Sequence, residues 1–122
     1  MDEYTAEELR QARAALSDAD KLRETNATDE AIVNRLYYAC FHAASAALHE
    51  RGSDPTTHRG VISTFGEEVV LEGDASRDAG RFLNRMRNER MTADYEHTPI
   101  TADVEILRER TGEFVAEMED IV

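Results

Sequence analysis

An arginine and a histidine near residue 90 are the residues of this sequence best suited to chemistry on a phosphate. Arg90 and His97 are seven positions apart, and Asp94 and Tyr95 stand between them. A guanidinium group can stabilise the negative charge that develops on a phosphate in a transition state. A histidine, which titrates near neutral pH, can move a proton onto or off the attacking or leaving oxygen. Together these two groups suffice for metal-free cleavage of RNA by its own ribose 2′-hydroxyl.

Arg90 also stands out because of the helix face on which it falls. On a wheel of 3.6 residues per turn, it lies in the middle of an apolar face formed by Ala79, Leu83, Met86 and Ala93. A buried guanidinium without a partner is strongly destabilising, so Arg90 must be paired or must face a cleft or a subunit interface. Two interpretations stay open: a structural ion pair, with Asp94 or with a neighbouring helix, and a functional role.

Positive charge is concentrated in the same stretch. Residues 77–90 contain five arginines and two acidic residues, a local net charge of +3, whereas the whole chain carries −12. Because binding of phosphate needs local positive potential, we predict that Arg87 takes part in binding RNA or a nucleotide. The other three arginines fall on the opposite helix face, where we expect them to be solvated: Arg77, Arg81 and Arg85.

A second set of polar side chains falls on a helix that is apolar on almost every side. Residues 36–48 are nearly all apolar, a pattern typical of a helix buried among others. Arg35, His42 and His49 nonetheless follow one stripe at seven-residue spacing. We interpret this as a central helix whose stripe faces a partner subunit or lines a groove, and we predict that Arg35 and His42 bind RNA or a nucleotide. His58 is a further predicted binding residue, because it lies at an expected helix start and helix N-termini attract anions.

Other kinds of site find little support in the sequence. His42 and His49 lack the spacing and the acidic partner of a zinc site, and neither a metal nor another cofactor is expected. The sequence contains no glycine-rich phosphate loop and no serine nucleophile motif. The lone Cys40 lies in an apolar stretch, so we expect a core side chain rather than a nucleophile.

Segments with helical periodicity must position all of these residues. We expect helices over about 5–23, 31–50, 57–69, 76–93 and 101–121, with Thr5 and Thr101 among the predicted N-caps. Short connections make neighbouring helices antiparallel, so this order predicts an all-α fold, an up-down antiparallel four-helix bundle with one extra short helix. At 122 residues the whole chain, 1–122, is expected to form one domain.

The overall charge and hydropathy indicate in which cellular compartment and in what kind of organism the protein works. The chain has 26 acidic and 14 basic residues, and only Lys21 is a lysine. Such an acidic, lysine-poor composition is typical of halophilic proteins, in which concentrated salt screens the self-repulsion. No run approaches the roughly 20 apolar residues of a membrane span, and the acidic start does not resemble a secretory signal. We therefore expect a cytoplasmic protein, without membrane association, from a halophile.

Three stretches resemble the HEPN domain family, in its subgroup of small stand-alone prokaryotic proteins: Asn34–Ala44, Thr57–Val61, and Arg90 with Ala93–Tyr95. The resemblance implies an all-α bundle that dimerises. It also implies the activity of many members, which are metal-independent endoribonucleases and toxins encoded beside a minimal nucleotidyltransferase antitoxin. The resemblance implies a motif of an arginine and a histidine with four to six residues between them, and two copies of this motif that meet across the dimer interface. Arg90 and His97 match this motif at its outer spacing, although Met91 stands where a polar residue is usual.

Two hypotheses follow. In the preferred one the chain is a homodimeric HEPN ribonuclease, paired with a nucleotidyltransferase antitoxin, in which Arg90 holds the scissile phosphate and His97 is the general acid and base. Asp94 and Tyr95 would orient these two groups. In the alternative the chain is a non-catalytic module that uses the same cleft to hold a nucleotide or to assemble with a nucleotidyltransferase. Arg90 and Asp94 would then form a buried interface ion pair.

Overall fold

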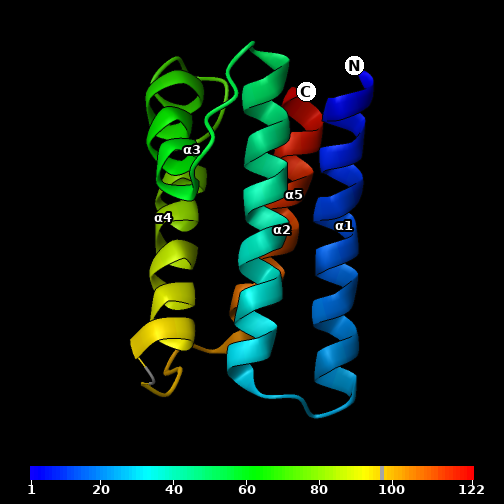
Figure 1. Ribbon diagram of the computed structural model, residues 1–122, viewed down its shortest axis with the longest axis vertical. Helices are drawn as coiled ribbons and strands as arrows, with labels where there is room; N and C mark the ends of the chain where they lie inside the picture. The colour runs from blue at the N-terminus through cyan, green and yellow to red at the C-terminus, as the bar shows by residue number, and fades with distance from the viewer. Residues whose placement is uncertain (97) are drawn as a thin grey trace.

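The structure, a computed structural model, describes residues 1–96 and 98–122 (Figure 1). Its elements are α1 (Glu3–Glu24), α2 (Asp29–Glu50), α3 (His58–Thr64), the π-helical segment η1 (Phe65–Val70), α4 (Arg77–Met91), the π-helical segment η2 (Thr92–Glu96) and α5 (Val104–Ile121). Within the described residues no strand occurs. The predicted all-α class is therefore confirmed.

The four long helices alternate in direction (Figure 1). α1 and α4 run away from the end at which both chain termini lie, and α2 and α5 run back toward it. α2 is central, because it packs against α1, α4 and α5 and also against α3, η1 and η2. This is the predicted up-down four-helix bundle with an additional short helix.

Its central position explains why α2 is apolar almost all the way round. Leu36, Tyr37 and Cys40 are fully buried, and small alanine side chains on both α1 and α2 let these two helices approach closely. Burial raises the pKa of the Cys40 thiol to about 12, so the thiol stays protonated. Cys40 is the core side chain that the sequence predicts. None of the described helices is long and apolar enough to cross a lipid bilayer.

Short polar side chains cap the start of the three middle helices. Thr28, Thr57 and Ser76 precede α2, α3 and α4, and each side chain accepts a hydrogen bond from a backbone N–H three residues further on. Such caps satisfy N–H groups that have no partner within the helix. These three starts agree with the sequence analysis to within two residues.

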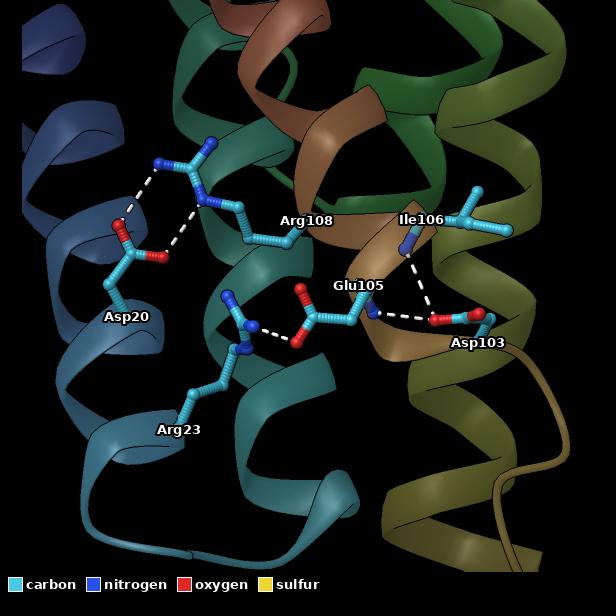
Figure 2. Close-up of polar contacts among 6 residues, drawn as sticks. All are labelled: Asp20, Arg23, Asp103, Glu105, Ile106 and Arg108. Carbon is cyan, nitrogen blue, oxygen red and sulfur yellow. Dashed lines mark hydrogen bonds and ion pairs between the residues drawn. The ribbon is translucent and has the colours of Figure 1, made fainter.

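The predicted N-caps at the other two helices are wrong. Asp2, not Thr5, caps α1, and its side chain accepts a hydrogen bond from the backbone N–H of Thr5, which is itself buried in the first turn. Asp103, not Thr101, caps α5, where its Oδ1 accepts from the backbone N–H groups of two residues in the first turn, Glu105 and Ile106 (Figure 2). A carboxylate near a helix N-terminus also interacts favourably with the helix dipole.

Ion pairs join the start of α5 to the end of α1 (Figure 2). Arg108 donates two hydrogen bonds to the carboxylate of Asp20, at 2.8 and 3.0 Å, and Arg23 pairs with Glu105. Because such partly exposed pairs stabilise a protein by only about 0–1 kcal/mol each, their main effect is to fix how α5 docks on α1.

Candidate functional site

Arg90 lies between α4 and α2, and only 16 % of its side chain is exposed. Its guanidinium carbon stands over three tyrosine rings, at 5.1 Å from the ring centroid of Tyr37, 5.4 Å from that of Tyr38 and 5.8 Å from that of Tyr95. A cation is attracted to the face of an aromatic ring. Two tyrosines of α2 and one of η2 therefore stabilise a positive charge on an otherwise apolar helix face.

Within residues 1–96 and 98–122, one carboxylate and one hydroxyl are the polar partners of Arg90. Nε lies 3.2 Å from Oδ2 of Asp94, and Nη2 donates a long hydrogen bond of 3.4 Å to the hydroxyl of Tyr38. The buried Nε–H is not aimed at the carboxylate, so this contact is an ion pair without a well-directed hydrogen bond. Asn34 donates to the same Oδ2 at 3.3 Å. The sequence left open a structural ion pair or a functional role for Arg90. The structure contains the ion pair with Asp94 within a single chain.

Asp94 and Tyr95 belong to η2, which continues α4 and packs against α2. In a π-helical segment the backbone hydrogen bonds reach one residue further than in an α-helix, and such segments are frequent at functional sites. The side chain of Asp94 is 27 % exposed and Tyr95 is 61 % exposed. The Arg90 ion pair is therefore open to solvent on the η2 side.

His58, at the start of α3, reaches the same tyrosines. Its Nδ1 lies 2.9 Å from the hydroxyl of Tyr37, and its ring stacks on Phe41 with centroids 4.3 Å apart. Burial raises the pKa of Tyr37 to about 12, against the opposing charges of Arg90 and Arg87, so the tyrosine keeps its proton. Burial, and secondly the charge of Arg90, lower the pKa of His58. The imidazole is therefore neutral at neutral pH, and its Nδ1 shares a hydrogen bond with the tyrosine hydroxyl.

Two further predicted binding residues border this cluster. Arg35 donates from Nε and Nη2 to the side-chain oxygen of Asn34, at 3.1 and 2.8 Å, and its guanidinium carbon lies 5.0 Å from the centroid of an α2 tyrosine ring, that of Tyr38. Arg87 lies one turn before Arg90 on α4. Of these arginines, Arg90 contacts the carboxylate of Asp94 directly, and Arg35 is linked to it through the side chain of Asn34.

The remaining predicted histidines are placed differently. His42 borders the cluster, with its ring centroid 6.2 Å from that of Tyr38, but its Nδ1 contacts Oε2 of Glu8 on α1 at 2.8 Å. His49 contacts two carboxylates at the other end of α2. His97, predicted to be the general acid and base, lies outside the described residues. Over residues 1–96 and 98–122, no group of three or more His, Cys, Asp and Glu side chains is arranged to hold a metal ion.

Sequence reasoning did not select Tyr37 and Phe41 as site residues. Both fall in the apolar run of α2, a pattern that predicts core side chains. A usable signal was present: aromatic residues at 37, 38 and 41 occupy adjacent positions on a helix that also carries arginine. Aromatic rings next to arginine on a helix favour a cation-binding cluster.

A family model matches almost the whole chain. The model of the family described as HEPN domain covers residues 6–121. The chain belongs to the HEPN domain family. This confirms the resemblance drawn from the sequence.

Several curated proteins are similar to this HEPN chain. It is 42 % identical over 86 residues to a Thermotoga maritima protein named UPF0332 protein, an alignment that covers 70 % of this chain and 64 % of that one. It is 39 % identical over 84 residues to a Methanocaldococcus jannaschii protein named "Putative toxin MJ0605", covering 69 % and 62 %. It is 38 % identical over 85 residues to UPF0332 protein PH1297 of Pyrococcus horikoshii, covering 70 % and 54 %. The chain thus spans less than two thirds of the length of these relatives.

Proposed function

We propose that this HEPN protein is a toxin of the metal-independent endoribonuclease type. The observation that carries the proposal is the setting of Arg90, whose guanidinium lies mostly buried among three tyrosines but opens to solvent beside Asp94. Preorganised positive charge in a site with little water stabilises charge that develops on a phosphate. The toxin part of the proposal is supported by the name of the Methanocaldococcus jannaschii relative.

Arg90 would hold the scissile phosphate of a single-stranded RNA. The ribose 2′-oxygen attacks phosphorus and loses its proton, the bond from phosphorus to the 5′-oxygen breaks, and that oxygen gains a proton. In this proposal His97 takes and returns the proton, while Asp94 and Tyr95 orient the two catalytic groups. Asp94 is well suited to hold the Arg90 side chain in place, because it lies 3.2 Å from Nε and also accepts a hydrogen bond from Asn34.

We further propose that the protein acts as a homodimer and that a minimal nucleotidyltransferase serves as its antitoxin. The half-buried stripe of α2, formed by Arg35, Tyr38, Phe41 and His42, is the proposed dimer face. It adjoins the exposed ring of Tyr95. Two copies that meet there bring two Arg90 clusters to one cleft, as the resemblance implies. Antitoxin binding would then occlude or modify that cleft.

A second function is favoured by one observation. Arg90 already has an ion-pair partner within its own chain, Asp94, so its charge is partly neutralised without any ligand. In this alternative the protein is a non-catalytic module that holds a nucleotide or assembles with a nucleotidyltransferase through the same cleft.

Cleavage of RNA in the presence of EDTA separates the two functions. The purified protein is incubated with single-stranded RNA, and the products are analysed for 2′,3′-cyclic phosphate ends. The ribonuclease proposal predicts such ends in EDTA. Intact RNA, together with saturable nucleotide binding, would instead support the binding module.

A further inference from the structure

A small basic cavity lies between α3 and α4, next to the Arg90 cluster. Its volume is about 300 Å³, and it is lined by Arg59, Ile62, Ser63, Asn84 and Arg87. The lining thus combines two guanidinium groups with a hydroxyl and an amide, and the described part of the chain contributes neither a carboxylate nor an aromatic ring to it. This chemistry suits a small anion.

The arginines of this cavity differ from most others in the chain. Seven arginines form ion pairs with carboxylates: Arg10, Arg13, Arg23, Arg51, Arg81, Arg90 and Arg108. Arg59 and Arg87 form no ion pair with residues 1–96 or 98–122. In a chain with nearly twice as many acidic as basic residues, two arginines from different helices share a cavity without a carboxylate in its lining. Their mutual repulsion is relieved when an anion binds between them.

The cavity is joined to the Arg90 cluster through both helices. Arg59 directly follows His58 on α3, and Arg87 precedes Arg90 by one turn on α4, a rise of about 4.5 Å along the axis. Arg87 also acts on the cluster electrostatically, since its charge opposes the rise in the pKa of Tyr37 that burial causes. An anion in the cavity would therefore lie close to an anion held by Arg90.

We propose that Arg59 and Arg87 form a phosphate subsite, with Asn84 and Ser63 as neutral donors. Guanidinium groups bind phosphate oxygens through paired, charge-assisted hydrogen bonds. The absence of an aromatic ring from the lining favours a backbone phosphate over a stacked base. The ligand is a phosphate of an RNA strand, adjacent to the one that Arg90 holds; this assignment to RNA rests on the proposed function, whereas the anion site itself does not.

Inorganic phosphate is the first probe, at constant ionic strength. The side-chain Nε–H signals of the arginines are followed by NMR during the titration. We expect saturable shifts for Arg59 and Arg87. The shift of Arg87 should weaken in Arg59→Gln, and both shifts should be retained in Arg85→Gln, which replaces an exposed arginine of the same helix outside this cavity. Shifts that never saturate, or that weaken equally in the Arg85 variant, would mean an adventitious ion only and would overturn the proposal.

The second probe tests the assignment to RNA without relying on cleavage. Binding of a tetranucleotide that lacks 2′-hydroxyls is compared with binding of a dinucleoside monophosphate, which has a single phosphate. Because charge-assisted hydrogen bonds to phosphate are strong, the double variant Arg59→Gln/Arg87→Gln should bind the tetranucleotide about tenfold more weakly relative to the dinucleoside monophosphate. An unchanged ratio would refute the RNA subsite even if RNA is cleaved. The expected loss of binding would support the subsite even if the wild-type protein leaves RNA intact.

Discussion

His58 of α3 and His49 of α2 experience opposite environments. His58 stacks on Phe41 and shares a hydrogen bond with the hydroxyl of Tyr37, and both burial and the charge of Arg90 lower its pKa. His49 contacts Asp54 at 2.6 Å and Asp2 at 2.9 Å. The hydrogen bond to Asp54, and secondly that to Asp2, raise the pKa of His49 above its ordinary value. The first histidine is thus kept neutral, and the second is stabilised in its charged form.

An NMR titration of the imidazole nitrogens should therefore place the two histidines on opposite sides of the ordinary pKa of 6.5. The unfolded chain protonates His58 more readily than the folded protein does, so its contribution lowers stability as the pH falls below about 6.5. His49 has the opposite sign, because its contribution is present below its unfolded pKa and is lost as the pH rises through its folded pKa.

Asp54→Asn provides the control for this titration. The substitution should lower the pKa of His49 and leave that of His58 unchanged, because Asp54 is not among the groups that shift His58. A folded protein in which His58 titrates above 6.5 would contradict the buried, arginine-facing environment described here.

At the scale of single residues, the sequence predicted contacts within one helix but not contacts between helices. The contact between Arg90 and Asp94 could be predicted from the sequence, because residues four positions apart on one helix lie next to each other. Tyr37 and His58 are 21 positions apart, and they meet only because α3 packs against α2 in one particular way. Nothing in local periodicity specifies that packing.

At the scale of elements, helix ends show the same division between local and non-local information. Thr28, Thr57 and Ser76 cap helices whose starts the sequence predicts to within two residues, because a periodic segment directly follows each of them. At α1 and α5 two cap-forming residues compete within three positions, and the acidic one caps in both cases. The π-helical segments η1 and η2 were not predictable either, since an extra residue in one turn does not change the pattern of apolar residues enough to be recognised.

The cap of α5 gives a direct test at this scale. Asp103→Ala removes the acceptor for the N–H groups of Glu105 and Ile106 and should lower the free energy of unfolding by about 1 kcal/mol. The matched control is Thr101→Ala, an exposed residue outside the helix, which should change it by less than about 0.5 kcal/mol. Urea unfolding measures both, and equal losses would argue against Asp103 as the cap.

At the scale of the whole molecule, the net charge of −12 is the dominant feature. Ion pairs such as that of Arg108 with Asp20 neutralise part of this charge across the α1–α5 contact (Figure 2). The 26 acidic residues nevertheless outnumber the 14 basic ones, so the basic residues cannot pair with all of them. Self-repulsion of this kind destabilises a compact state and is screened by salt. The halophilic origin predicted from composition depends on this balance.

Raising the KCl concentration from about 0.1 M to about 2 M should therefore increase the free energy of unfolding. Replacing exposed carboxylates by amides, as in Asp18→Asn/Glu67→Gln, should raise stability at low salt and reduce its dependence on salt. Stability that is constant or falls over this range in the wild-type chain would show that charge repulsion is not what limits it.

The function proposed for the whole molecule depends on the guanidinium of Arg90. The most direct test compares kcat/KM for cleavage of single-stranded RNA in EDTA between the wild type, Arg90→Ala and the exposed-arginine control Arg85→Ala. Since removal of one preorganised donor to a transition-state oxyanion costs about 10²–10³-fold in rate, Arg90→Ala should lose at least that much while Arg85→Ala stays close to wild type. A folded Arg90→Ala protein that cleaves RNA as fast as the wild type would contradict the account.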